Sequence, residues 1–249
     1  MSNKDLTQWP AGVNRIILES IGSTMTEAAR RAPTITAPTW IMAHVQTDGR
    51  GRLGRSWLTP SGNLTATLIY SPQGTLMQAS QRSFVASLAL FDALAHFVPA
   101  AQLALKWPND VLLNGGKVAG ILLETSAHRD ELFHLSVGIG VNLQHAPDVP
   151  DAAFAPTSLR AAGADVSAED FLAILANTYA THEAALVDHG FDRIRREWLV
   201  HAARLGEVIT ARTSQAEITG TFQTIDETGN LVLLTEAGPK IIPAADVYF

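Results

Sequence analysis

Residues 46–57 constrain this chain more than any other stretch, because they place three arginines and three glycines directly before a tryptophan. Three guanidinium groups this close together repel one another unless an anion joins them, while glycine lets the backbone wrap that anion and expose its N–H groups. The planar guanidinium also binds two oxygens at once, which suits phosphate and carboxylate. We therefore predict a loop that orders over an anionic ligand. The alternative is a solvated basic turn, which rarely combines this glycine spacing with a terminal tryptophan.

Two phosphate-binding motifs match this stretch by letter, and both can be rejected. Residues 49–54 have the G-x-G-x-x-G spacing of a dinucleotide site, and residues 49–56 fit a P-loop in which Arg55 replaces the lysine. Both motifs need a helix directly after the glycines, with its N-terminus facing phosphate. Pro60 and Gly62 argue against such a helix. The acidic ribose contact expected about 20 residues further on is also missing.

The composition is that of an ordinary globular protein. Of its 249 residues, 47% are hydrophobic and 17% are charged, and the formal net charge is −6. This acidic balance argues against a protein whose main task is holding nucleic acid. Because the chain has no cysteine, disulfides and thiolate metal sites are excluded, which fits a reducing compartment. Neither a signal-peptide core nor an apolar run of about 20 residues is visible, so we expect a cytoplasmic protein with no membrane partner.

Hydrophobic periodicity predicts strands and helices in the first 204 residues. Apolar alternation and turn signals indicate strands at 13–19, 40–46, 64–70, 103–107, 110–113, 118–123 and 132–141. Helical spacing and capping residues indicate helices at 24–30, 76–97, 167–187 and 191–203. We expect residues 1–204 to form one α+β catalytic domain, in which helices pack on a mixed β-sheet.

The pattern changes after Gly206. From there on the sequence predicts only short strands, at 208–212, 217–225, 231–234 and 240–247. Turn-forming residues separate them at 227–230 and 237–239. We expect residues 205–249 to form a second domain, a small closed β-barrel.

A lysine at the end of one predicted strand is the next unusual feature. Lys106 is held between Leu105 and Trp107, where a fixed ammonium would stabilise a pentavalent phosphorus transition state. A strand-end lysine that extends its ammonium into water is the ordinary alternative. Asn109 and Asp110 follow closely, and their side chains fit a cation site or a capped turn equally well.

Two later strands contain glycines in unusual places. Gly120 lies in the strand that begins beside Lys117, and Gly138 lies inside an apolar strand. A glycine within a strand often marks a place where a ligand or another backbone approaches closely. Asn142 ends the second strand, and its amide can pair with the edge of a heterocycle. Each of these signals is weak alone.

Taken in order, the motifs at 49–57, 106–110, 117–124 and 138–142 resemble those of the biotin–protein ligases. The resemblance covers roughly residues 13–249. It implies a catalytic domain like those of class II aminoacyl-tRNA synthetases and biotin or lipoate ligases, followed by an SH3-like β-barrel. It further implies that ATP, with Mg²⁺, activates biotin as biotinyl-5′-adenylate with release of pyrophosphate. A lysine of a biotin carboxyl carrier domain then accepts the biotin.

The resemblance also implies roles for individual residues. Lys106 and Arg50 would be catalytic, with Lys106 bridging the biotin carboxyl group and the α-phosphate. The positions that match biotin contacts are Ser23, Thr24, Gln46, Gly49, Arg50, Arg52, Lys106, Gly120 and Gly138. The positions that match nucleotide contacts are Arg52, Arg55, Trp57, Lys106, Lys117 and Asn142. Trp57 would stack on adenine and Asn142 would hydrogen-bond its edge, whereas the metal ligands stay unidentified.

Two departures from the family pattern qualify these expectations. The family usually has Ser-Thr-Asn before the short helix, whereas this chain has Met25 in the third place. We expect altered biotin affinity or a substitute contact rather than lost activity. Bifunctional members carry an N-terminal winged helix that binds DNA, but about a dozen residues precede the first predicted strand here. We therefore expect a monofunctional ligase without a nucleic-acid partner.

The sequence is compatible with two other functions. A lipoate or octanoate–protein ligase, or an acyltransferase of the same fold, would share the scaffold but should lack the arginine stretch. A non-enzymatic nucleic-acid binder would use that stretch to grip a phosphate backbone, against which the acidic net charge counts. Family members often dimerise through sheet edges, and the sequence leaves monomer and homodimer both open.

Overall fold

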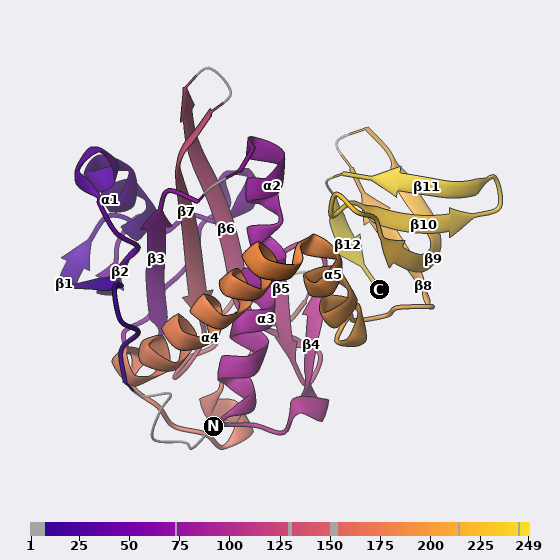
Figure 1. Ribbon diagram of the computed structural model, residues 1–249. Coiled ribbons are helices and arrows are strands. Elements are labelled where there is room, and N and C mark those ends of the chain that lie inside the picture. The colour runs from indigo at the N-terminus through magenta and orange to yellow at the C-terminus, as the bar shows by residue number, and fades with distance from the viewer. Residues whose placement is uncertain (1–7, 73, 129–130, 150–153, 214, 244) are drawn as a thin grey trace.

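A seven-stranded mixed sheet organises the first part of the molecule (Figure 1). The computed structural model describes residues 8–249 except 73, 129–130, 150–153, 214 and 244. The strands lie in the order β1-β2-β3-β7-β6-β5-β4, and only β1 and β2 run parallel. Their bounds are β1 Asn14–Ile21, β2 Thr39–Gln46, β3 Leu64–Tyr70, β4 Leu103–Lys106, β5 Asp110–Leu113, β6 Gly116–His128 and β7 Glu131–Val141. The expected mixed sheet is confirmed, with β6 and β7 longer than the apolar alternation predicts.

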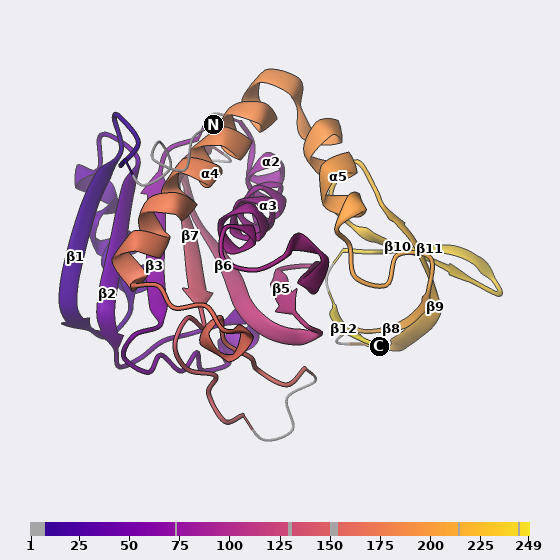
Figure 2. The same ribbon diagram turned by 90° about the horizontal axis from the view of Figure 1, so that it is seen from below.

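Five α-helices accompany this sheet in the described part of the chain. They are α1 Thr24–Arg31, α2 Leu76–Ser80, α3 Arg82–Ala95, α4 Ala168–His189 and α5 Phe191–Val200. Figure 2 shows α3 and α4 side by side across one face of the sheet. The long helix expected over 76–97 is two helices: the capping box of Thr75 and Gln78 starts a short α2 that ends before Gln81, and α3 begins directly after Gln81. Short 3₁₀ turns occur at Ala32–Thr34, Arg52–Gly54, Ala100–Gln102 and Arg160–Ala162.

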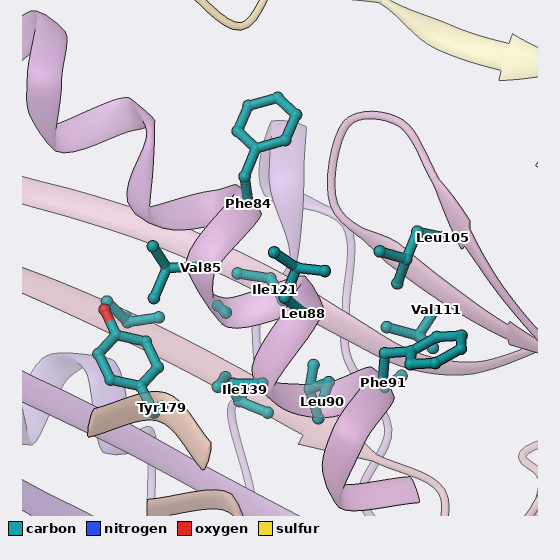
Figure 3. Close-up of a cluster of buried hydrophobic side chains, with 14 of the residues drawn as sticks. Phe84, Val85, Leu88, Leu90, Phe91, Leu105, Val111, Ile121, Ile139 and Tyr179 are labelled. Atoms are coloured by element: carbon teal, nitrogen blue, oxygen red, sulfur yellow. The ribbon is translucent and has the colours of Figure 1, made fainter. Parts of the chain in front are cut away.

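The main core lies between the sheet and the helices α3 and α4. Leu88 of α3 lies beside Ile121, Phe91 points toward Val111, and Tyr179 of α4 lies at the left of the view (Figure 3). All five side chains are buried. Burying a large apolar side chain stabilises a fold by about 1.5–3 kcal/mol, so this layer holds the sheet rigid from one side.

The opposite face of the sheet is lined differently. A small apolar cluster of Ala28, Ile41 and Ile69 fixes α1 against β2 and β3. Because successive strand residues point to opposite faces, the residues between the core positions of β3, β6 and β7 also lie here. Apart from Leu122 and Ile69, those that line this face are small or polar, among them Thr65, Thr67, Gly120, Gly138 and Gly140. This face therefore has room for a ligand.

The C-terminal part forms a five-stranded antiparallel sheet. Its strands are β8 Val208–Arg212, β9 Glu217–Ile225, β10 Leu231–Thr235, β11 Gly238–Ile242 and β12 Asp246–Tyr248, in the order β11-β10-β9-β8-β12. The strand expected over 240–247 is two strands, and the second pairs with β8. No pairing joins β11 to β12 among the described residues, so the expected closed barrel is not confirmed by the hydrogen bonds.

Several contacts fix the C-terminal sheet at the β4 end of the main sheet (Figure 1). The indole Nε1 of Trp107 donates to the carbonyl oxygen of Gly229 at 3.0 Å. Leu105 of β4 exchanges backbone hydrogen bonds with His201 and Ala203, both 2.8 Å long, just after α5. These contacts bring β12 close to the arginine stretch. None of the helices in the described residues combines the length and the apolar character needed to cross a membrane.

Candidate active site

A cavity of about 830 Å³ lies on the sheet face opposite α3 and α4. All but one of the site residues expected from the sequence line it: Ser23, Thr24, Gln46, Arg50, Arg52, Arg55, Trp57, Lys106, Lys117, Gly120, Gly138 and Asn142. The exception is Gly49, which does not line the cavity but packs against Gln46 and Trp57, two residues that do. A Cβ there would overlap the Gln46 amide and the Trp57 backbone. Four motifs that are far apart in the sequence therefore meet around one space.

Glycines make the floor of this cavity flat. Gly120 and Gly140 face each other across the β6–β7 pair, and the indole of Trp57 lies over both. A Cβ on Gly140 would overlap the indole ring, and one on Gly120 would come within 3.1 Å of Trp57 Cζ3. One row further along, Gly138 is covered by Met25. Two large side chains thus rest directly on backbone.

The most buried end of the cavity is polar. The Gln46 side-chain oxygen accepts hydrogen bonds from the Thr24 backbone N–H at 2.8 Å and from the Thr24 hydroxyl at 3.1 Å. Thr67 in turn donates to the Thr24 hydroxyl oxygen at 2.9 Å. The Ser23 hydroxyl is buried and has no hydrogen-bond partner among the described residues. Such a group costs free energy unless a ligand or water satisfies it.

The arginine stretch folds back on itself as a compact loop. The backbone N–H of Gly51 donates to the Arg55 carbonyl oxygen at 2.7 Å, and that of Trp57 donates to Gly49 at 2.9 Å. Leu53 sits at the turn with a φ of 56°, a value that non-glycine residues rarely adopt. As expected, no helix follows the glycines.

The three guanidinium groups are each met by an acceptor from a distant part of the chain: Arg50 by Glu124 at 3.0 and 2.9 Å, Arg52 by Asn109 at 3.1 Å, and Arg55 by Asp246 in an ion pair. Glu124 raises the pKa of Arg50, whereas burial lowers that of Arg52. The stretch is therefore held by acceptors from β6, from the turn between β4 and β5, and from β12.

Two lysines flank one buried carboxylate in the centre of the site. Lys106 and Asp110 are cross-strand partners in the β4–β5 pair, so the turn between them returns the carboxylate to the ammonium. The Nζ atoms of Lys106 and Lys117 lie 3.3 and 2.7 Å from the two Asp110 oxygens. Phe154 lies beneath the Lys106 ammonium at 4.6 Å and Trp57 beneath that of Lys117 at 5.5 Å.

Burial and charge act against each other in this cluster. Burial by itself raises the pKa of the Asp110 carboxyl, but the attraction of Lys117 and Lys106 outweighs it and holds that pKa below its usual value. Burial lowers the pKa of the Lys106 ammonium, and Asp110 offsets this only in part. The three groups form a charged cluster with one positive charge in excess.

The whole cavity has a positive excess. Among its described lining residues, six cations face three carboxylates: Arg50, Arg52, Arg55, Lys106, Lys117 and Arg212 against Asp110, Asp148 and Asp246. A ligand with several anionic oxygens would balance this charge. Asn142 adds a buried amide, which donates weakly to the Lys117 carbonyl at 3.4 Å and has no partner for its oxygen among the described residues.

Sequence reasoning missed several residues of this site. It identifies Asp110 only as a cation ligand or turn cap, and Glu124 only as a letter of its motif. Asp246, Arg212 and Tyr248 line the cavity from the C-terminal sheet. No local pattern could have identified these three, because Asp246 meets Arg55 across 191 residues of sequence.

Comparisons with known proteins agree with this geometry. Residues 17–142 match the model of the biotin/lipoate A/B protein ligase family, and residues 205–249 match the biotin protein ligase C terminal domain. A biotin--[acetyl-CoA-carboxylase] ligase of Paracoccus denitrificans is 50% identical over 238 residues, which cover 94% of this chain and 99% of the relative. The bifunctional ligase/repressor BirA of Bacillus subtilis is 31% identical, over 93% of this chain and 73% of its own.

A solved structure has a similar fold. The biotin protein ligase of Aquifex aeolicus in complex with biotin and ATP superposes with a TM-score of 0.79 at 28% sequence identity, covering 94% of this chain and 98% of that one. Both the sequence match and the fold therefore agree with the motifs gathered in the cavity. The chain belongs to the biotin/lipoate A/B protein ligase family.

Proposed function

We propose that the protein is an ATP-dependent biotin–protein ligase, a biotin–[biotin carboxyl carrier protein] ligase. It activates biotin as biotinyl-5′-adenylate, releases pyrophosphate, and transfers biotin to a lysine of a biotin carboxyl carrier domain. The observation that carries this proposal is the single cavity that gathers all four motifs around a positive excess. The name of the Paracoccus denitrificans relative supports it, as does the complex of the Aquifex aeolicus ligase with biotin and ATP.

The buried polar end of the cavity is assigned to the biotin ring system. Its ureido group has both donors and acceptors, which suits the unpaired Ser23 hydroxyl, the Thr24 hydroxyl and the Gln46 amide. Gly49 keeps Gln46 and Trp57 close together, and Gly120 and Gly138 leave room on the floor. Ring binding at this end directs the biotin carboxylate toward the cations.

The other end is assigned to the nucleotide. Trp57 would stack on adenine, and the unpaired oxygen of Asn142 would accept from its edge. Arg52 and Arg55 would neutralise phosphate oxygens, while Arg50 would lie nearer the biotin carboxylate. To bind an anion, each arginine must release part of its present contact. The free energy lost is small for the partly exposed ion pairs of Arg50 with Glu124 and of Arg55 with Asp246.

The reacting atoms are assigned to the space beside Lys106 and Lys117. A biotin carboxylate oxygen forms a bond to the α-phosphorus while the bond from that phosphorus to the bridging oxygen breaks, and pyrophosphate leaves with the electron pair. Two ammoniums fixed by one carboxylate stabilise the charge that develops, because they need no reorganisation at that moment. In the second step the acceptor amine attacks the acyl carbon, loses a proton, and AMP leaves.

Two further elements complete the proposal. Mg²⁺ usually keeps several waters and binds through one or two carboxylates together with substrate phosphates. Asp246, which lines the nucleotide end, would hold it, and the bound ion supplies additional charge neutralisation. Because a mixed anhydride hydrolyses readily, the arginine stretch would also act as a lid that excludes water.

The finer description of the fold belongs to the same proposal. We infer that residues 1–204 are a catalytic domain of the class II synthetase-like type and that residues 205–249 are an SH3-like domain. The C-terminal match begins at residue 205 and supports this boundary.

The proposal also includes the location and the partners of the protein. We expect it to be cytoplasmic, to act on a carboxyl carrier domain and to have no nucleic-acid partner. A homodimer stays a prediction.

Mass spectrometry of a carrier domain mixed with the protein, biotin and MgATP tests the proposed function. One biotin adduct on a single lysine is expected, and none without ATP. Lipoate and octanoate in place of biotin are the parallel reactions. Modification by these acids alone would favour the ligase or acyltransferase alternative. No adduct of any kind, together with salt-sensitive DNA binding, would favour the nucleic-acid binder.

Arg52→Ala is expected to weaken nucleotide binding by about 10- to 100-fold, because a largely buried guanidinium makes strong charge-assisted hydrogen bonds to phosphate. Biotin affinity should change less. Isothermal titration with a non-hydrolysable ATP analogue and with biotin measures both constants. Arg196→Ala on α5, which removes a largely exposed guanidinium outside the cavity, is the control. A loss of biotin affinity alone would show that the arginines are assigned to the wrong substrates.

A further inference from the structure

Met25 is the apolar member of the polar end of the cavity. It follows Ser23 and Thr24 at the start of α1, and only 4% of it is exposed. Its side chain covers Gly138 of β7, where a Cβ would lie 2.7 Å from the Met25 sulfur and 3.1 Å from its Cγ. The thioether therefore occupies the space that any other residue at position 138 would fill.

Met25 also differs from its neighbours in freedom of movement. Thr24, Gln46 and Thr67 hold one another through hydrogen bonds of 2.8 to 3.1 Å. Met25 is unbranched, has three rotatable bonds and makes no hydrogen bond, so its side chain can rearrange at low cost. The next atom near the Gly138 position is the backbone oxygen of Leu122, at 3.5 Å, which cannot move away. Of the groups at this end of the cavity, the Met25 side chain is therefore the one that can change its conformation most easily.

The chemistry of biotin determines which part would meet Met25. Its carboxylate belongs beside the cations, so the ring system at the other end of the acyl chain reaches the buried end. The ureido side of the rings suits Ser23, Thr24 and Gln46. The opposite side, the sulfur-containing ring, is apolar and suits the thioether on its glycine.

We propose that Met25 is a specificity-determining residue, whose thioether sets the room available to the sulfur-containing ring of biotin. This inference rests on the proposed function. It predicts that analogues with extra atoms on the ring sulfur bind more weakly the further Met25 extends from Gly138 into the cavity. Biotin sulfone, which has two added oxygens on the ring sulfur, is the probe.

Two substitutions change this room in opposite directions. Met25→Ala removes the thioether, so the ratio of the sulfone Kd to the biotin Kd should fall by about tenfold relative to wild type. Gly138→Ala adds a methyl group that pushes the flexible Met25 into the cavity, so the same ratio should rise by a similar factor. Met25→Leu, with similar volume, should keep the ratio within about threefold.

Isothermal titration of the full-length protein with biotin and with biotin sulfone measures these ratios. Met77→Ala on α2, whose side chain is exposed, is the matched control, and melting temperatures report whether each variant is folded. Ratios that stay constant in both Met25→Ala and Gly138→Ala, or that move in the same direction, overturn the inference. If one variant does not fold, the direction of the change in the other decides. A wild-type protein that binds no biotin would overturn the proposed function itself.

Discussion

Replacing Lys106 with alanine is expected to lower the rate of adenylate formation by about three orders of magnitude while leaving the fold intact. A fixed donor aimed at a transition state in a water-poor site typically contributes about 10²- to 10³-fold, and we expect the upper end here because the reacting phosphate is highly charged. The Lys106 side chain is 7% exposed and is held by Asp110 at 3.3 Å, so its position needs no ordering before the reaction. Biotin-dependent release of pyrophosphate measures the rate.

Two companion variants sharpen this experiment. Lys117→Ala removes the second ammonium on the same carboxylate, at 2.7 Å, and a comparable loss would show that the two lysines act together. Lys240→Ala removes an exposed lysine of β11 and should react like wild type. Near-normal pyrophosphate release by Lys106→Ala would remove this residue from the reaction centre.

Asp110→Asn is expected to have the largest effect on stability. The carboxylate is nearly buried and is the shared partner of Lys106 and Lys117. Removing one partner of a buried ion pair leaves uncompensated charge and typically costs about 3–5 kcal/mol. Urea denaturation followed by circular dichroism measures the free energy of unfolding. Asp188→Asn, at an exposed position of α4, should have no measurable effect.

The pH dependence gives this prediction a second readout. The pKa of Asp110 is lower in the folded protein than its ordinary value, because the two ammoniums outweigh the effect of burial. A lowered folded pKa means that the stabilisation is fully present above the unfolded pKa, about 3.9, and is lost as the pH falls through the folded pKa. The free energy of unfolding should therefore differ most between wild type and Asp110→Asn at neutral pH, and this difference should begin to shrink below about pH 4 and disappear as the pH falls through the folded pKa. A difference that does not depend on pH would contradict this account.

The elements with strong local signals could be predicted from the sequence. β3 has the expected bounds because Thr alternates with apolar residues over 64–70. Asn114 and Gly115 form the turn between β5 and β6 with φ values of 50° and 79°, which asparagine and glycine adopt more readily than other residues. The boundary between α2 and α3 could not be predicted. The helical spacing of apolar residues continues past Gln81, so the sequence pattern predicts one helix where the structure has two.

The candidate site was predictable to the extent that its residues belong to compact motifs. Lys106 could be identified because it lies between Leu105 and Trp107 at the end of a predicted strand. Trp57 could be identified because it directly follows the arginines and glycines of residues 46–56. The tertiary partners could not be found in this way. Which acceptor meets Arg50 or Arg55 depends on strand order and on the docking of the C-terminal sheet, and no sequence period encodes either.

The ion pair between Arg55 and Asp246 has a consequence for how the protein is made. A ribosome that has translated up to residue 205 has already produced the arginine stretch and both lysines of the cavity. The β12 wall is still missing at that moment, since residues 246–248 are translated later. A nascent chain therefore carries a more open cleft than the finished one, and its Arg55 still lacks the Asp246 carboxylate. This ion pair forms only after residues 246–248 have left the exit tunnel and folded back.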